Sequence, residues 1–570
     1  MKVVYLGTAS RRNMPPPSLE GDVIELFWNN WNDYGYQTSF PTTCRIKGKL
    51  VELGLIRLLV DGKHYTCAYL DQLLAKGWDG VFPIPDTDYI SIPSEIAFYE
   101  QLEGAVGYRI ATRVAKALHD ASYLVRVVDD ETAKRLVETE GFKNSLQRER
   151  GSTKAYLDGW KILERQAIAV LDLGFRYKDI FGKTATLNLK FQADSPLPHD
   201  VNVLIGANGS GKSRVLHQMV DDWMTQSKDD ELGFISKPNL NQLVVVSYSP
   251  FERFPVDYQP NSVQDSLAYR YFGFRGRSAP SESNKRGKIR LSHDFPKSNA
   301  AEGLVACLSD DKRYRAIRDW AHKVKTVERV LLSAFDFDFA AVDVSASKRP
   351  QIFYSETDDV NPLSIEIGDG DDLRRFIPIT SGHVAKLKDE ALRKWILPKN
   401  GVTFFKNGSP VELSSGQRLF AYIVINILGV IRRNSLILVD EPELYLHPTL
   451  EIQFVDMLKK ILSQFNSKAL LATHSLVTVR EIPADCVHVF ERTDDNEVVV
   501  KHPPFQTFGG DVQRISSYVF GDRSVSKPFE RWIAEQIEEL GSGGALLEAL
   551  GDELNEELIV QIKAMERGQW

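Results

Sequence analysis

The stretch Gly206-Ala207-Asn208-Gly209-Ser210-Gly211-Lys212-Ser213 decides the fold of this chain. It follows the apolar run Val201–Ile205 and precedes apolar residues at helical spacing, namely Val215, Met219 and Trp223. A buried strand, a glycine-rich turn and a helix in this order are typical of a loop that holds the phosphates of a nucleotide. We therefore predict an α/β fold that is built around a nucleotide site.

Each residue type in this loop has a predicted role. The glycines allow the backbone to turn its N–H groups inward around the β-phosphate. Lys212 is expected to reach the β- and γ-phosphates, and the Ser213 hydroxyl is expected to ligate Mg²⁺. The predicted nucleotide-binding residues are Gly206, Asn208, Gly209, Ser210, Gly211, Lys212 and Ser213.

The bulk composition is that of a folded protein with several domains. The 570 residues suggest roughly three to four domains. A net charge of −7 does not indicate a general nucleic-acid binder. The four cysteines lack metal-ligand spacing and fit a reducing compartment. The longest apolar run, Leu419–Ile431, is far shorter than the roughly 20 residues of a membrane span. We expect a soluble, cytoplasmic protein with no membrane contact.

Three parts are expected along the chain. Residues 1–165 are predicted to form an N-terminal α+β accessory lobe. Residues 166–510 are predicted to form the nucleotide-binding domain, with a helical insertion at about residues 250–400. A short helical segment that docks a partner is expected over residues 511–570, with an acidic amphipathic helix at Ala545–Met565 after a polar linker, Gly541–Gly544. A segment that only covers the nucleotide-binding domain is the alternative.

The N-terminal lobe shows strand patterns first and helical periodicity later. Alternating or clustered β-branched and aromatic residues predict strands at Asp22–Trp28, Tyr36–Ile46, Leu50–Val60 and His64–Leu70. Helical periodicity runs from Ser94 to about Arg126. Trp28 and Trp31 are predicted to be core residues. No catalytic constellation is visible in this lobe.

The insertion contains one helical pattern and one basic stretch. Tyr314–Phe335 has apolar residues at helical spacing and is predicted to be an amphipathic helix. The stretch Arg270–Lys297 carries eight basic residues, with the rings of Tyr269, Tyr271, Phe272 and Phe274 interleaved at its start. Basic charge with stackable rings fits a nucleic-acid surface, whereas the Ser, Pro, Gly and Asn residues in its middle fit a solvated loop. Both interpretations stay open.

A second motif supplies carboxylates. The apolar segment Ser435–Val439 is followed by Asp440, Glu441 and Pro442, which predicts a buried strand that ends in two acids. In phosphate-loop enzymes an acid at this place holds Mg²⁺ opposite the loop serine, which suits Asp440. Glu441, one residue beyond the strand, can accept a proton from an attacking water.

Two shorter signals flank this acidic motif. Ala469–Thr473 is a short apolar strand that ends at His474, which is placed to sense the γ-phosphate and hold the attacking water. Upstream, Ser414, Ser415, Gly416 and Gln417 form a Ser-Gly-rich turn before a long apolar helix. A turn that opens a helix is itself an anion-binding geometry.

In this order, the motifs resemble those of ABC-type, AAA-family ATPases, and the soluble SMC/Rad50-like branch fits better than the transporters. The resemblance covers about residues 166–510, except for the insertion. It implies ATP and Mg²⁺ as cofactors, Glu441 as the catalytic base, His474 as the switch residue and Tyr177 as a stacking partner for adenine. It also implies that Ser414, Ser415, Gly416 and Gln417 act in trans, so that a head-to-tail dimer encloses two ATP molecules.

Two departures from the pattern of this class are visible. Ser415 stands where the signature usually has glycine. After the apolar segment Leu243–Ser247 the sequence runs Tyr248-Ser249-Pro250-Phe251-Glu252-Arg253, and no glutamine loop is evident. The usual glutamine ligand for Mg²⁺ and water is therefore not visible, and a nucleotide-gated scaffold with little turnover is the third interpretation.

The residues after Asp440 resemble a smaller group of proteins within this class. ATPases of prokaryotic anti-phage defence, such as the Septu ATPase and the ATPases paired with retrons, have a stretch similar to Asp440-Glu441-Pro442-Glu443-Leu444-Tyr445-Leu446-His447-Pro448. The acidic residues Glu491, Asp494 and Asp495 are interpreted as a surface turn, so no nuclease chemistry is expected in this chain. The resemblance implies that the chain regulates a separately encoded effector, an HNH-type nuclease. A DNA-maintenance ATPase of the RecF/Rad50 type is the alternative.

Overall fold

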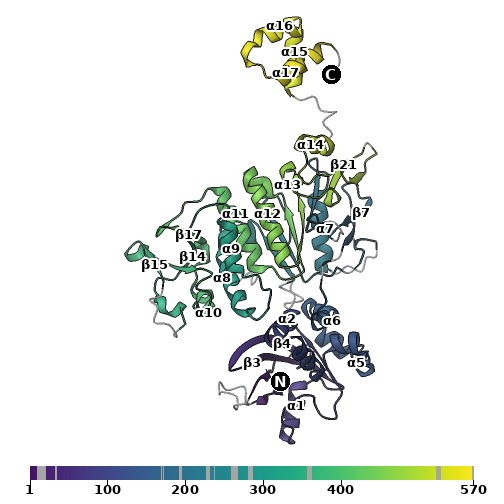
Figure 1. Cartoon of the computed structure of the whole chain (residues 1–570), viewed down its shortest axis with the longest axis vertical. Helices are drawn as coiled ribbons and strands as arrows, with labels where there is room; N and C mark the ends of the chain where they lie inside the picture. Colours follow the sequence, from purple (N-terminus) through teal and green to yellow (C-terminus); the bar gives the residue numbers. More distant parts are fainter. Residues whose placement is uncertain are drawn as a thin grey trace. The chain divides into compact units, whose positions relative to one another are not determined.

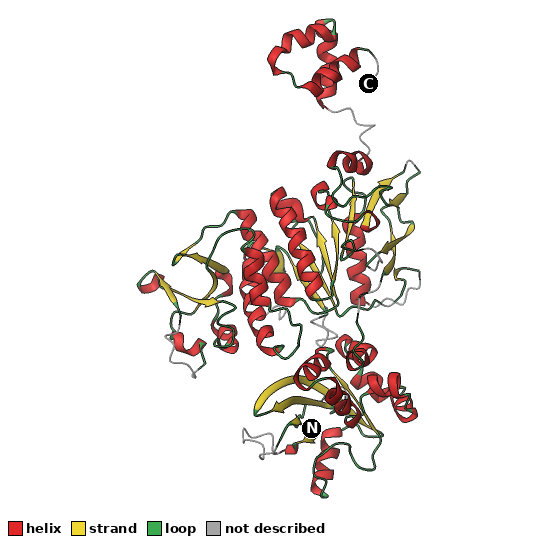
Figure 2. Ribbon diagram, viewed as in Figure 1, coloured by secondary structure: helices red, strands yellow, loops and turns green. Residues whose placement is uncertain are grey.

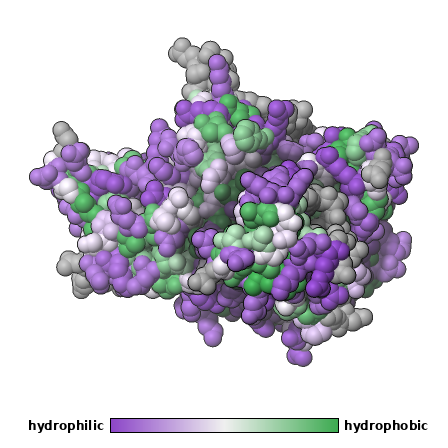
Figure 3. Space-filling view, turned by 90° about the horizontal axis from the view of Figure 1, so that it is seen from above, coloured by the Kyte–Doolittle hydropathy of each residue, from purple (hydrophilic) through white to green (hydrophobic). Residues whose placement is uncertain are grey.

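The computed structural model describes residues 1–8, 21–32, 35–168, 170, 172–191, 196–225, 231–236, 238–257, 268–279, 287–355, 363–493, 495–520 and 528–567. The chain forms two compact units, Met1–Gly509 and Gly510–Trp570. Among the described residues, no helix combines the length and the apolar character that a membrane span requires. The surface seen in Figure 3 is largely hydrophilic, with smaller apolar patches between charged side chains.

The first unit begins with an α+β lobe that has its own hydrophobic core. Its sheet has the order β1-β2-β3-β4-β5, with β1 and β2 parallel and the other neighbours antiparallel. The strands are β1 Lys2–Tyr5, β2 Val23–Leu26, β3 Ser39–Ile46, β4 Lys49–Val60 and β5 Tyr89–Pro93. The helices are α1 Thr66–Ala75, α2 Ala97–Val106, α3 Tyr108–Ala117, α4 Ala121–Tyr123, α5 Glu131–Val137 and α6 Arg150–Leu163.

Two expectations for this lobe are wrong. The strand expected at His64–Leu70 is helix α1, because Cys67 and Leu70 are three residues apart and face the core together. The helical region expected from Ser94 to about Arg126 is confirmed and is divided into α2, α3 and α4, with Gly107 at a φ of +78° between α2 and α3. Trp31, expected in the core, is 63% exposed, whereas Trp28 packs against the core.

A seven-stranded sheet forms the centre of the first unit (Figure 1). Its order is β11-β10-β19-β20-β8-β21-β22, and neighbouring strands are parallel except for β21 with β22. The strands are β8 Val201–Gly206, β10 Gln242–Ser247, β11 Tyr269–Phe272, β19 Ser435–Asp440, β20 Lys468–Ala472, β21 Val487–Arg492 and β22 Val498–Lys501. β8, β10 and β19 are buried along their whole length, as expected of parallel strands that are covered on both faces.

Helices cover both faces of this sheet (Figure 2). α7 Lys212–Thr225 packs between the large sheet and a smaller antiparallel sheet of order β7-β6-β9, and one core cluster joins all three. The smaller sheet consists of β6 Leu173–Lys178, β7 Thr184–Leu189 and β9 Gly233–Phe234. α11 Ser415–Val430 lies beside α12 Pro448–Gln464 and packs along α8 Asp294–Arg313. This is the α/β phosphate-loop ATPase core that the sequence predicts.

The insertion contains helices and also a sheet that the sequence analysis did not anticipate. Its sheet has the order β15-β16-β14-β17-β18, from Ile365–Ile367, Arg374–Ile379, Phe339–Val344, Val402–Lys406 and Ser409–Pro410. The helix expected at Tyr314–Phe335 is confined to α9 Lys323–Leu331, and the longest helix here, α8, was missed. A short two-stranded ribbon, β12 Arg275–Arg277 with β13 Ile289–Leu291, and helix α10 Asp389–Trp395 complete the insertion.

In the first unit, α13 Leu476–Arg480 lies between β20 and β21, and α14 Val512–Phe520 begins the second unit. The second unit also holds α15 Pro528–Leu540, α16 Gly543–Leu550 and α17 Glu556–Glu566 around Ile533, Leu546 and Ile562. The prediction of a single helix at Ala545–Met565 is therefore wrong. The expected linker is also shorter, because Ser542 caps α16 by accepting a hydrogen bond from the backbone N–H of Ala545 at 3.1 Å.

Candidate functional site

The phosphate loop lies at the carboxyl end of β8, where ligands bind in open α/β sheets. Gly206 has a φ of +152°, and a Cβ there would lie 2.3 Å from the carbonyl oxygen of Phe490 on β21. Gly211 has a φ of +100°, in the region that favours glycine. Asn208 and Gly209 are exposed, while Ser210 is buried. The glycines therefore serve close packing and the turn of the loop.

Lys212 is held at the centre of this loop. Its Nζ donates hydrogen bonds to the carbonyl oxygens of Gly206 at 3.0 Å and Ala207 at 3.3 Å. Burial lowers the pKa of Lys212 to about 8, while the nearby carboxylates of Glu441, Glu443 and Asp440 oppose this shift. Its ammonium group is thus close to the carboxylates that end β19.

Ser213 and Asp440 meet although they are far apart in the sequence. The Ser213 hydroxyl donates to Oδ1 of Asp440 at 2.8 Å. Burial raises the pKa of Asp440 to about 7, helped by the charges of Glu441 and Glu443 and opposed by the Ser213 hydrogen bond. Adjacent hydroxyl and carboxylate oxygens are a donor set suited to Mg²⁺. The buried Ser210 hydroxyl makes no hydrogen bond among the described residues and adds a polar atom to the loop.

Glu441 follows β19 in a left-handed conformation, with a φ of +50°. Its backbone N–H donates to the carbonyl oxygen of Ala472 at 2.8 Å, which fixes it beside the end of β20. Burial and the charge of Glu443 raise the pKa of Glu441, against the opposing effect of Lys212. Non-glycine residues in this region cost roughly 1–3 kcal/mol and are concentrated at functional sites.

His474 lies beside Lys212 at the end of β20. Its Nε2 is 3.0 Å from Nζ of Lys212, so the neutral imidazole accepts from the ammonium group. Burial, and then the charge of Lys212, lower the pKa of His474. The structure therefore brings the loop, Asp440, Glu441 and His474 together at one edge of the sheet.

Sequence reasoning missed Glu443, which positions this histidine. Its Oε1 accepts from the backbone N–H of His474 at 2.6 Å, and its Oε2 accepts from the Thr473 hydroxyl at 2.8 Å. Ser475 in turn donates to a carboxylate oxygen of Glu451. Glu443 directly follows Asp440-Glu441-Pro442, so the motif itself contains this residue. Its hydrogen-bond partner His474, however, comes after the neighbouring strand β20 and is not apparent from the motif.

The Ser-Gly-rich turn forms the start of α11. Ser414 and Gln417 make a reciprocal capping box: Oγ of Ser414 accepts from the N–H of Gln417 at 3.3 Å, and Oε1 of Gln417 accepts from the N–H of Ser414 at 3.1 Å. Ser414 and Ser415 are exposed. A Cβ at Gly416 would lie 3.2 Å from the carbonyl oxygen of Tyr445, just beyond Asp440–Glu441. The turn is therefore rigid, and its hydroxyls face solvent.

Tyr177 does not have the environment expected of an adenine platform. It is 1% exposed and packs in the core at a centroid distance of 6.3 Å from Phe490. The alternation of β6 turns Phe175 and Tyr177 to the buried side of the small sheet. Phe181, in the turn after β6, is 41% exposed. Its neighbour Ile180 approaches Gly211, which places Phe181 near the loop.

The segment after β10 does not provide a glutamine loop. Phe251 is 88% exposed, whereas Glu252 is buried and accepts from the Phe254 N–H at 2.7 Å and from the Tyr271 hydroxyl. The charge of Glu252 contributes to the raised pKa of Asp440, so Glu252 lies near the site. Ser247 is paired in register with Asp440, and its buried hydroxyl makes no hydrogen bond among the described residues.

The basic stretch Arg270–Lys297 is not a stacking surface. Tyr269, Tyr271, Phe272 and Phe274 are each at most 8% exposed, since the first three belong to β11 of the central sheet. Arg275 and Arg277 pair with Glu252 and Asp257. Residues 280–286 lie outside the described part of the chain. Lys288 and Arg290 are exposed on or beside β13.

The structure describes two of the three acidic residues that lie downstream, Glu491 and Asp495. Glu491 lies on β21 and forms an ion pair with Lys501 of β22. Asp494 lies outside the described residues, and Asp495 is exposed.

Comparisons with known proteins agree with this geometry. Residues 201–480 match the family model "AAA domain, putative AbiEii toxin, Type IV TA system". Protein ea59 of Escherichia phage lambda is 22% identical over 570 residues, covering 96% of both chains. A putative ABC transporter ATP-binding protein of Bacillus thuringiensis subsp. konkukian (strain 97-27) is 23% identical over 263 residues, which span 45% of this chain and 40% of that protein.

Two similar solved structures have low overall scores. The SMC head domain from Thermotoga maritima has a TM-score of 0.25 and 10% identity, and the match covers 59% of this chain and all of that domain. UvrA2 from Deinococcus radiodurans has a TM-score of 0.24 and 13% identity, and the match covers 60% of this chain and 39% of that one. Residues 201–480 of this chain therefore match an AAA-domain family model, and their loop geometry and strand order are those of an ATP-binding α/β domain.

Proposed function

We propose that this chain hydrolyses ATP with the help of Mg²⁺ and that two copies associate head to tail around two ATP molecules. The observation that carries the proposal is the contact of the Ser213 hydroxyl with Asp440, beside the contact of Lys212 with His474. These four groups come from three separate segments, namely the phosphate loop, the end of β19 and the end of β20, and meet where a terminal phosphate would lie. Hydrogen bonds that served only the stability of the fold would not require all four groups at the same edge of the sheet.

The residues have separate tasks in this proposal. The loop N–H groups and Lys212 bind the β- and γ-phosphates, and Ser213 and Asp440 hold the metal. Bound Mg²⁺ would neutralise charge on the phosphate oxygens. Glu441 accepts the proton of the attacking water, which its raised pKa favours at neutral pH. His474 holds that water and responds to the γ-phosphate, while Glu443 keeps its backbone in place.

Exposure around the site supports a dimer. Ser414 and Ser415 present hydroxyls at a helix N-terminus, a favourable place for phosphate. Three large apolar side chains on loops after β10 and β19 are also exposed, namely Phe251 at 88%, Leu444 at 48% and Tyr445 at 43%. Apolar side chains beside a polar site are suited to a second copy that covers both. In this arrangement Ser414–Gln417 of one copy close over the ATP of the other.

Two variants test the catalytic assignment. Lys212→Ala should abolish ATP retention because the ammonium group that meets the phosphates is lost. Glu441→Gln should retain ATP but lower turnover about 100-fold or more, because the base is lost while the loop is intact. ATP binding and phosphate release are measured, with exposed Glu390→Gln on α10 as the matched control. Wild-type turnover of Glu441→Gln would refute its role as the base.

We further propose that the ATP cycle controls a separately encoded effector, an HNH-type nuclease, in anti-phage defence. The similarity of Asp440–Pro448 to defence ATPases supports this. Purification of the chain with the products of its neighbouring genes should recover a nuclease. Salt-sensitive, ATP-dependent DNA binding by the chain alone, reduced by Lys288→Gln and Arg290→Gln, would instead favour a DNA-maintenance ATPase.

A further inference from the structure

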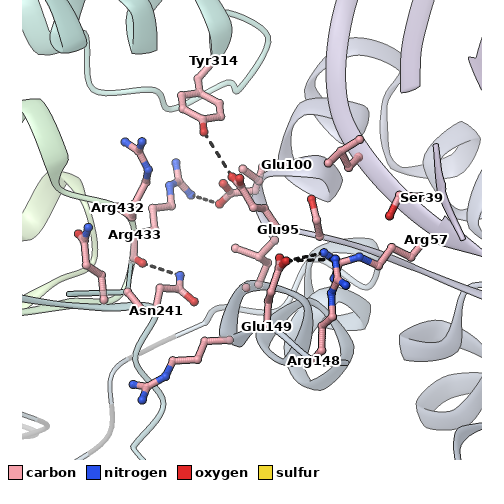
Figure 4. A pocket seen from close by; sticks show the side chains of 18 of the residues that line it. Ser39, Arg57, Glu95, Glu100, Arg148, Glu149, Asn241, Tyr314, Arg432 and Arg433 are labelled. Carbon is pink, nitrogen blue, oxygen red and sulfur yellow. Dashed lines mark hydrogen bonds and ion pairs between the residues drawn. The ribbon is translucent and has the colours of Figure 1, made fainter. Parts of the chain in front are cut away.

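A second cavity lies in the first unit, away from the phosphate loop. It has a volume of about 470 Å³, within the range of small-molecule sites. Its walls come from the N-terminal lobe, from the segment between α8 and α9 that holds Tyr314, and from segments at the amino ends of β10 and β19 (Figure 4). The phosphate loop and Asp440 lie at the carboxyl ends of the same sheet, so ATP held there cannot fill this cavity.

Positive charge dominates the wall of this cavity. Five arginines line it, against three glutamates: Arg57, Arg148, Arg150, Arg432 and Arg433, with Glu95, Glu100 and Glu149. The difference is two positive charges. Arg57 pairs with Glu149 at 2.8 Å, and Arg433 pairs with Glu100 at 2.8 Å. Arg432 pairs at 2.6 Å with Asp310, which does not line the cavity, so the summed charge of the lining residues is positive although these three arginines have carboxylate partners. An anion is the ligand that such a wall favours.

The cavity also offers an aromatic face and an unused acceptor. Trp31, which the sequence placed in the core, lines the cavity and is 63% exposed. The amide nitrogen of Asn241 donates to the carbonyl oxygen of Arg433 at 2.6 Å, and Figure 4 draws this bond. Its Oδ1 is buried and makes no hydrogen bond among the described residues. A buried acceptor of this kind calls for a donor, such as the N–H group of a base.

From these features we infer that this cavity binds a free nucleotide with one or two phosphates. The arginines meet the phosphate, Trp31 stacks on the base, and Oδ1 of Asn241 accepts a hydrogen bond from it. The inference concerns a site separate from the phosphate loop and does not depend on the proposed dimer. It gives the N-terminal lobe, in which no catalytic residues were found, a role in ligand binding.

Calorimetry on the full chain tests this site. Lys212→Ala is introduced first, so that the phosphate loop no longer retains nucleotide. The probes are AMP, GMP, CMP, UMP and ADP, together with adenosine, inorganic phosphate and a 5′-phosphorylated tetranucleotide. At least one of the nucleotides should bind once per chain, more tightly than adenosine or phosphate alone.

Two further substitutions on this background locate the binding. Trp31→Ala removes the exposed ring, and Asn241→Asp keeps the side-chain size but adds negative charge. Each should weaken nucleotide binding about tenfold or more. Trp532→Ala, at an exposed tryptophan of α15, and Asn466→Asp, at an exposed asparagine, are the matched controls and should leave it unchanged.

Three results would overturn the inference. One is that no nucleotide binds below about 1 mM. Another is an affinity that either cavity substitution leaves unchanged. The third is binding of the tetranucleotide alone, which would assign the cavity to a nucleic-acid end and not to a free nucleotide.

Discussion

Burial favours the uncharged form of the Asp440 carboxyl group, and the charged form therefore lowers the stability of the folded protein. Its pKa is raised to about 7, chiefly by desolvation, whereas an unfolded chain has an aspartate pKa near 3.9. The folded protein therefore binds the proton of this carboxyl group more tightly than the unfolded chain does. The resulting loss of stability is absent below about pH 4 and complete above about pH 7.

Asp440→Asn should therefore stabilise the nucleotide-free protein at pH 8. The asparagine oxygen still accepts from Ser213, and the buried charge is removed. Thermal unfolding midpoints of both proteins from pH 4 to pH 8 measure this, and the advantage of the variant should vanish towards pH 4. A variant that is equally stable or less stable at pH 8 would contradict the burial argument.

At this scale the sequence predicts that Lys212, Ser213, Asp440 and His474 follow the ends of buried strands. Because parallel strands bring such ends to one edge, the structure places these four residues together. Glu443 and Ser247 were missed because their positions depend on the register between strands. The structure does not support the predicted contact of Tyr177 with adenine, because the alternation of the short strand β6 turns this side chain to the buried face.

The N-terminus of α11 combines a structural task with the proposed binding task. Ser414→Ala removes the side-chain cap and should destabilise the protein by about 1 kcal/mol. Ser414→Asp keeps a good cap, but it adds negative charge where a phosphate of the other copy is proposed to lie. It should therefore preserve stability and abolish ATP-dependent dimerisation.

Unfolding midpoints and light scattering with ATP separate these two effects. Ser542→Ala, at the cap of α16, is the matched control and should affect stability without affecting ATP-driven association. Normal dimerisation of Ser414→Asp would exclude this turn from the ATP interface.

Element assignments failed where tertiary packing overrides local pattern. The α1 segment carries residues that fit either a strand or a helix, and its packing under β4 selects the helix. The sheet of the insertion was not recognised because its strands β15 and β18 are only three and two residues long. The buried parallel strands β8, β19 and β20 were predicted correctly because their apolar runs are continuous, whereas β11 and β21 were not predicted.

At the scale of the whole molecule, the C-terminal unit folds around its own small core. Leu546→Ala should remove about 2–4 kcal/mol, enough to unfold a unit of this size. ATP binding by the first unit should be unchanged, because the two units have separate cores. Limited proteolysis reports the unfolding and ATP titration reports the site, with exposed Val560→Ala as the control. A matching loss of ATP affinity would show that the units depend on each other.

The sequence predicts the order of the parts but not the cavity of the first unit. That cavity brings together Trp31, Arg57, Asn241 and Arg433, which belong to segments with no common motif. Only the packing of the N-terminal lobe against the start of β10 and β19 assembles it. A pattern along the chain cannot reveal such a site.

Mixing two inactive variants tests the central claim most directly, namely that each ATP site is shared between two copies. Lys212→Ala disables the loop, and Ser415→Arg blocks the turn with a bulky side chain. Each variant alone should be inactive. In an equal mixture, half of the dimers are mixed and each holds one intact site, so about a quarter of the wild-type ATPase rate should return. A mixture as inactive as its components would contradict the shared site.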